Sequence, residues 1–107
     1  MQYIPNGYFV TGIALKAYRD SLAIAERLAA ADPRNTMWQR GLAMSHGELA
    51  LVCERQGRFA DALQELTLGR DIVAALVATA PGNAHWKRDL EQFEHDIARL
   101  QTQAHAR

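Results

Sequence analysis

The sequence predicts an all-α protein, built as an antiparallel helical hairpin array of four helices. Two observations support this prediction. The segment 33–42 (PRNTMWQRGL) returns 48 residues later as 81–90 (PGNAHWKRDL), with Pro, Asn, Trp, Arg and Leu recurring in step. Around these segments the apolar residues step by three and four, as one face of a helix requires. An internal repeat of helical units is typical of a stacked array.

Length and charge restrict the class of protein. The 107 residues allow one domain with a modest core. Twelve basic and twelve acidic side chains cancel, so neither a nucleic acid nor an anionic membrane is a favoured partner. No apolar run approaches the roughly 18 to 20 residues of a membrane span, and the first twelve residues do not resemble a signal peptide. The single cysteine, Cys53, fits a reducing compartment, so a cytoplasmic location is expected.

The first ten residues, MQYIPNGYFV, combine a turn signal with large apolar side chains. We interpret residues 1–10 as an N-terminal arm that precedes a helical domain, 11–107. Large apolar side chains are costly to leave in water, so the arm is expected to pack on its own domain or on a neighbour.

The first helix is predicted at about residues 11–31, where Asp32 and Pro33 end it, because the residue before a proline is pushed out of the helical region. Its inward face is predicted from the residues that step by three and four: Ala14, Ala17, Tyr18, Ser21, Leu22, Ala25, Leu28 and Ala29. Apolar residues also lie away from this face, so the helix is expected to be buried on more than one side.

The second helix is predicted at about residues 36–56. Asn35 provides an N-cap at its start, and Gly57 can adopt the positive φ that ends a helix. Trp38 is expected in the core, and Cys53 is expected to be a small buried apolar residue, with no neighbouring base to activate it.

Two further helices are predicted at about 58–79 and 84–103, separated by a second stop and cap at 81–83. The last helix places Phe93, Ile97 and Leu100 on one stripe, while its other faces are charged. Trp86, which repeats Trp38, is again expected in the core. Short links between consecutive helices make them antiparallel.

Residues 49–63 (LALVCERQGRFADAL) place a small residue, a turn glycine, an aromatic residue and Ala-Leu at the intervals found in the middle of a tetratricopeptide repeat. The chain from about residue 12 to 100 resembles this family, although Ala50 replaces the usual Gly and the unit has 48 residues instead of 34. Residues 21–33 (SLAIAERLAAADP) resemble the long repeats of bacterial multidomain proteins. The resemblance implies a helical scaffold for protein interaction without naming the partner. Residues 11–31 then correspond to the second helix of a repeat whose first helix is absent, so we expect a fragment of a longer protein.

In the tetratricopeptide family the first helix of each pair lines a concave groove, and residues 36–56 and 84–103 correspond to these helices. The groove residues that the resemblance implies are Arg40, Met44, Gly47, Glu48, Leu51, Glu54, Arg55, Arg88, Gln92, His95, Asp96, Arg99 and Gln103. Arg40, Arg88 and Arg99 are expected to bind a peptide carboxylate or an acidic side chain through paired N–H donors. The function predicted is therefore binding of a peptide or helix in this groove. The alternative for these residues is a solvated face with local pairs such as Gln92 with Asp96.

An array that is cut inside a repeat leaves one apolar flank open. The charged last helix suits a C-terminal cap, whereas the first helix does not. We expect the free side of the first helix, with Leu15 and Ile24, to be covered by arm residues such as Tyr8 and Phe9 or by a second copy in a two-fold dimer. Homo-oligomerisation through this side is the alternative function.

The sequence shows no pattern for catalysis, cofactor binding or metal binding. It has neither a Gly-rich phosphate loop nor the spacing of a catalytic triad. His85, His95 and His105 are ten residues apart on one helix, about 15 Å, so they cannot share a metal ion. An enzyme with an unfamiliar site around His95, Asp96 and Arg99 is the least favoured alternative.

Overall fold

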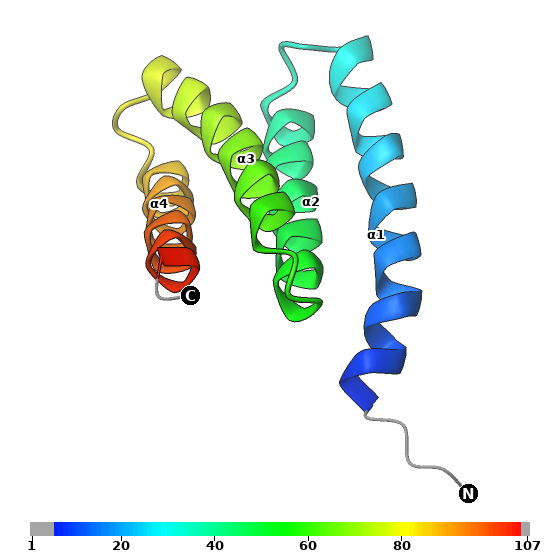
Figure 1. Ribbon diagram of the computed structural model, residues 1–107. Helices are drawn as coiled ribbons and strands as arrows, with labels where there is room; N and C mark the ends of the chain where they lie inside the picture. Colours follow the sequence, from blue (N-terminus) through cyan, green and yellow to red (C-terminus); the bar gives the residue numbers. More distant parts are fainter. Residues whose placement is uncertain (1–5, 106–107) are drawn as a thin grey trace, which may run out of the picture.

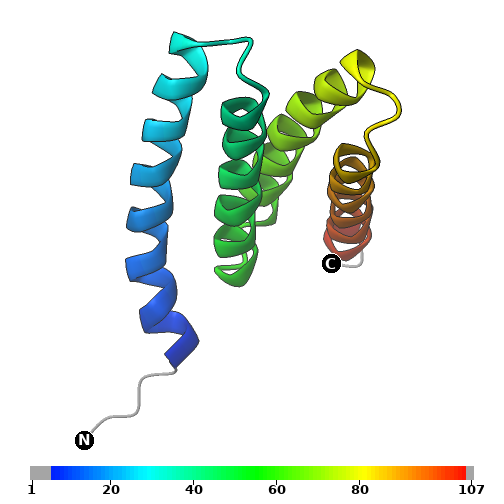
Figure 2. The ribbon, with the colours of Figure 1, turned by 180° about the vertical axis from the view of Figure 1, so that it is seen from behind.

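The computed structural model describes residues 6–105, and the side chains of residue 13 and residues 15–103. Four helices cover these residues, with no strand among them: α1 (Asn6–Ala31), α2 (Thr36–Arg55), α3 (Phe59–Thr79) and α4 (Ala84–His105). Figures 1 and 2 show them in a row, with α1 at one side, α4 at the other, and successive connections at alternate ends. The all-α antiparallel array is therefore confirmed.

The molecule is a flat slab of 53 × 32 × 19 Å. Its radius of gyration is 15.2 Å, whereas a compact domain of this length has about 13 Å. Each helix therefore packs mainly on its neighbours in the row, as a repeat array requires.

The two Pro-x-Asn connections have the same geometry, as the sequence repeat predicts. Asn35 Oδ1 accepts a hydrogen bond from the backbone N–H of Trp38 at 3.1 Å, and Asn83 Oδ1 accepts one from Trp86 at 3.0 Å. Each bond satisfies a backbone donor that the first helical turn leaves without a partner. The expected caps of α2 and α4 are thus confirmed.

The tight turn between α2 and α3 depends on Gly57, which has φ +77°. The N–H of Arg58 donates to the carbonyl of Cys53 at 2.9 Å, and the N–H of Gly57 donates to that of Glu54 at 2.9 Å. These two bonds form a Schellman motif, in which the left-handed residue is usually glycine. The role predicted for Gly57 is confirmed.

Helix α1 begins at Asn6, about five residues before the predicted start. Residues 6–10 are therefore helical and not part of an arm. Proline and glycine are tolerated at or just before the first turn of a helix, so the turn signal around Gly7 marks a helix start. Residues 1–5 and the side chains of Tyr8 and Phe9, which were expected to cover α1, lie outside the described part of the chain.

The inward face of α1 agrees with the predicted one only in part, because Tyr18, Leu22, Ala25 and Ala29 turn inward as expected but Ala17, Ser21 and Leu28 are exposed. Leu15, Tyr18 and Leu22 are half-buried and pack against the core, whereas Ala17 is exposed and Leu28 is 40% exposed. Leu15, which was not on the predicted stripe, gains more from burial than Ala17 would, so the inward face is turned toward Leu15. Leu15, predicted as a self-association residue, is a core-facing residue.

The hydrophobic core lies where α2, α3 and α4 meet. Its buried residues are Ala43, Leu49, Ala50, Cys53, Ala62, Leu66, Val73, Phe93, Ile97 and Leu100. The two tryptophans are only half-buried and are not among the side chains that pack against this cluster. The expectation that they are core residues is therefore wrong, because each lies in the first turn of its helix, at the border of the core.

Phe93 of α4 lies against two glycines of neighbouring helices. A Cβ atom built on Gly69 of α3 would lie 2.5 Å from Phe93 Cε1 and 3.1 Å from the carbonyl oxygen of Ala43, and one on Gly47 of α2 would lie 3.4 Å from Phe93 Cε1. Phe93 itself is only 6% exposed. The absence of a side chain at Gly69 thus allows the aromatic ring of α4 to reach α3 and α2.

We expect Gly69→Ala to destabilise the fold by about 1–2 kcal/mol, because overpacking a core outweighs the better helix propensity of alanine. Gly41→Ala is the matched control: nothing lies within 4 Å of its built Cβ, so it should gain up to about 1 kcal/mol. Denaturant unfolding measures both free energies. In a Phe93→Leu background the cost of Gly69→Ala should shrink, and an unchanged cost would contradict the contact.

Candidate functional site

Two ion pairs join α2 to α4. Arg40 Nε donates to Asp89 Oδ2 at 2.7 Å, and its Nη2 donates to Oδ1 at 3.2 Å. Near the other end of α2, Arg99 Nη1 donates to Glu54 Oε2 at 2.5 Å and its Nη2 donates to Oε1 at 3.0 Å. Both are two-pronged guanidinium–carboxylate pairs, which fix orientation as well as distance. They hold the two helices at a defined separation.

A hollow of about 270 Å³ lies between these helices. Its lining residues come mainly from α2 and α4: Met44, Gly47, Glu48, Leu51, Leu66, Asp89, Gln92, Phe93 and Asp96. Leu66 and Phe93 are buried core residues, so they form an apolar floor, and Leu51 is 47% exposed at the side. We call this hollow the α2–α4 groove. Its walls hold three carboxylates and no basic side chain.

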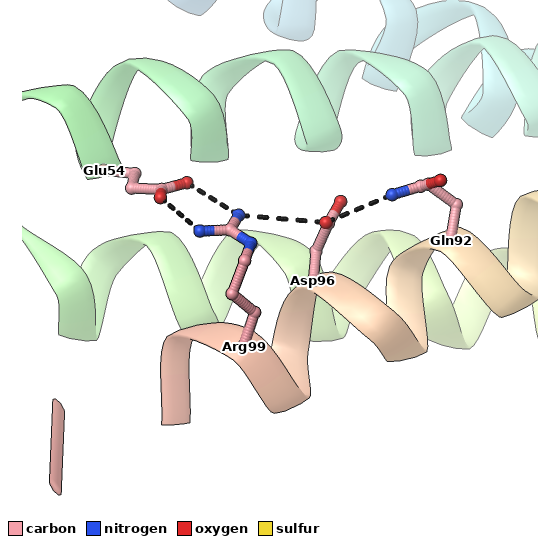
Figure 3. A network of polar contacts seen from close by, with 4 residues as sticks. All are labelled: Glu54, Gln92, Asp96 and Arg99. Atoms are coloured by element: carbon pink, nitrogen blue, oxygen red, sulfur yellow. Dashed lines mark hydrogen bonds and ion pairs between the residues drawn. The ribbon is translucent and has the colours of Figure 1, made fainter. Parts of the chain in front are cut away.

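A polar network borders one end of the α2–α4 groove (Figure 3). Arg99 bonds to Glu54 across the helices and lies 3.8 Å from Asp96 Oδ1 on its own helix. Gln92 Nε2 donates to the same Asp96 oxygen at 3.1 Å. Asp96 is thus held in place at the rim by two neighbours on α4.

The ion pairs shift the protonation of their members. The hydrogen bond from Arg99 holds the pKa of Glu54 below its ordinary value, and this outweighs the opposite effect of burial. The pKa of Arg40 is raised by its hydrogen bond to Asp89, and that of Arg99 by its hydrogen bond to Glu54. The Arg99–Glu54 pair therefore remains charged around neutral pH.

The structure gathers part of the predicted site. Six of the predicted groove residues line the hollow: Met44, Gly47, Glu48, Leu51, Gln92 and Asp96. Arg55, Arg88 and His95 are exposed and do not line it. Arg40 and Arg99 are engaged by carboxylates of the chain itself, so the expectation that they bind an acidic ligand is not supported by their geometry.

Sequence reasoning missed three residues of this region. Asp89 was not considered, although it holds Arg40 and lines the hollow. Phe93 was placed only on the apolar stripe of its helix and Leu66 only on the inward face of its own, yet both form the groove floor. One feature of the sequence could have pointed to Asp89. It is a carboxylate at a repeat position where the other copy of the repeat has Gly41, which has no side chain.

Two other reactive side chains, His46 and Cys53, are buried in the core region. His46 is buried, and its Nδ1 lies 2.8 Å from Glu65 Oε1 on α3. Cys53 is 2% exposed, and burial raises the pKa of its thiol, which keeps it from acting as a thiolate. Within the described residues no three of His, Cys, Asp and Glu are close enough to hold a metal ion. His95 is exposed, and Asp96 and Arg99 belong to the ion-pair network, so these three do not form an enclosed site.

Comparisons of the chain with models of known protein families, with curated proteins and with solved structures gave no match. In the described part of the chain, none of the helices has both the length and the apolar character that crossing a membrane requires.

The Arg99–Glu54 pair predicts a pH-dependent contribution to stability. Because the pKa of Glu54 in the folded state is below its ordinary 4.5, the ionised carboxylate stabilises the fold above about that pH, and the effect is lost as the pH falls through the lowered pKa. Glu54→Gln should therefore be less stable at neutral pH, by a few tenths to about 1 kcal/mol, and the difference from wild type should close in acid.

Denaturant midpoints at a series of pH values and one protein concentration measure this difference. Glu94→Gln, an exposed site on α4 outside both ion pairs, is the matched control and should follow wild type throughout. A gap for Glu54→Gln that stays constant down to the acid transition would show that the ion pair does not contribute.

Proposed function

We propose that this chain is a protein-interaction module that holds a short peptide or helix in the α2–α4 groove. The observation that carries the proposal is the exposed apolar side chain of Leu51 beside the floor of Phe93 and Leu66, between two helices held apart by ion pairs. An apolar floor with a polar rim is the usual form of a peptide-binding groove.

The resemblance to tetratricopeptide repeats supports this proposal. In that family the first helix of each pair lines the binding groove, and α2 and α4 stand at the corresponding places. Helical arrays of this kind bind through a few anchors, with an amphipathic helix or an extended segment laid into the groove. A cytoplasmic setting, which the reduced and buried Cys53 fits, is part of the proposal.

Charge indicates which segment the groove binds. The lining contains Glu48, Asp89 and Asp96, while the guanidinium groups of the two α2–α4 ion pairs, on Arg40 and Arg99, already bind carboxylates. A ligand with an apolar side chain and an adjacent lysine or arginine matches this wall, whereas an acidic peptide would face like charge. The ligand class is therefore a cationic, apolar-anchored protein segment.

Selection from a displayed library of random peptides tests the proposal. We expect the enriched peptides to share an apolar residue beside a basic one. Affinity should fall about tenfold or more for Leu51→Ala, as for an anchor contact. Glu48→Lys should weaken binding further and reduce its salt dependence.

Two results would contradict the proposal. One is a selection that yields no shared pattern. The other is a set of binders whose affinity is unchanged by Leu51→Ala. The matched control is Leu68→Ala on α3, which is similarly exposed at 43% but does not line the groove, and it should leave affinity unchanged.

A further inference from the structure

The two outer helices of the slab differ in their free faces. On α1, Ile13 is 60% exposed, Ile24 is 51% exposed and Leu28 is 40% exposed, whereas no large hydrophobic side chain among the described residues of α4 is exposed. Together with exposed Ala17, these residues step by four, seven and four, so they form one stripe along α1. We call this stripe the α1 free face. One end of the array is therefore closed by polar side chains and the other is open.

A hollow of about 230 Å³ lies beside the α1 free face, in the seam between α1 and α2. Its lining residues are Ser21, Ile24, Ala25, Leu28, Met37, Trp38, Gly41 and Ser45. Met37 is 77% exposed at its edge. This apolar hollow is continuous with the stripe, because Ile24 and Leu28 belong to both.

The internal repeat explains why this hollow exists. Ser21 and Ser45 stand 48 residues before Gly69 and Phe93. In the seam between α3 and α4 the Phe93 ring fills the space that Gly69 leaves. In the seam between α1 and α2 a serine replaces the aromatic residue, so the equivalent space is not filled from within the chain.

The second half of the molecule also shows what covers such a seam. There α2, antiparallel to α3, lies against the Phe93 ring through Gly47. One repeat earlier, α1 and α2 take the places of α3 and α4. The place that α2 holds beside α3 then falls next to α1, and a helix there would run antiparallel to α1 and cover the hollow. A single helix in that position would bury both the stripe and the hollow.

We propose that this helix is α1 of a second copy of the chain, in a two-fold dimer. The α1 free face is self-complementary: an antiparallel pairing centred between Asp20 and Ser21 sets Ile13 against Leu28 of the second copy, and Ala17 against Ile24 of the second copy. A two-fold interface requires such reciprocal pairs. The small Ala17 permits close approach, and Ile13, the most exposed of the three large side chains, enters the hollow beside Trp38.

Charge at the centre of this pairing is balanced within each chain. Asp20 lies near the two-fold axis, and Lys16 Nζ is 3.0 Å from its Oδ2. Each copy therefore brings an ion pair, and not an isolated carboxylate, to the axis. The dimer surface is separate from the α2–α4 groove, so the two proposals fail or succeed independently.

Sedimentation equilibrium over a wide range of concentrations tests the dimer. The wild-type chain of 11.9 kDa should approach the mass of two chains, and Ile24→Glu should remain a monomer with unchanged circular dichroism. The matched control is Leu68→Glu, an exposed apolar site on α3 outside the α1 free face, which should still dimerise. A monomeric wild type at every concentration, or an Ile24→Glu variant that still dimerises, would overturn the proposal.

A disulfide tests the register without altering the apolar residues. Asp20→Cys should form a disulfide-linked dimer on mild oxidation, because the two positions face each other across the axis, and adding Ile24→Glu should prevent it. Glu91→Cys, an exposed site on α4, should stay unlinked, and buried Cys53 should not interfere. Equal linking by the Asp20 and Glu91 variants, or no linking by either, would reject the pairing.

Discussion

The close approach of the Phe93 ring to two helical glycines is the constraint on which the arrangement of α2, α3 and α4 depends. The ring lies against Gly69 and Gly47, so α4 settles nearer to both helices than a side chain at either position would allow. That separation brings Arg40 within reach of Asp89 and Arg99 within reach of Glu54. The same ring forms the floor of the α2–α4 groove. Packing and the candidate site therefore have one common origin.

Local chemistry accounts for how much of the fold could be predicted from the sequence. Each cap and stop acts within a few residues of itself: Asn35 and Asn83 bond to the next turn, and Gly57 ends α2 by its own backbone angle. The orientation of α1 was predicted only in part, because its many alanines fit several faces equally well. Only the contacts made by Leu15, Tyr18 and Leu22 on the other helices select one face.

The candidate site was predictable in its position but not in its charge. Helical spacing places Met44, Glu48 and Leu51 on one face of α2, and they do line the groove. Spacing cannot show which carboxylate an arginine will meet on another helix, because Arg40 and Asp89 are far apart in sequence. The pairing of His46 with Glu65 on α3 depends in the same way on the tertiary fold.

The free face of α4 is polar and that of α1 is apolar, so the two ends of the slab have different surfaces. If both outer helices had an exposed apolar face, one molecule could add to the next without limit and produce a fibre. With one apolar end, assembly through that end would stop at two molecules, because each would leave only its charged α4 side exposed to solvent. Such an arrangement limits its own size, and it would leave two identical grooves at a set distance from each other, suited to a partner that offers its binding segment twice.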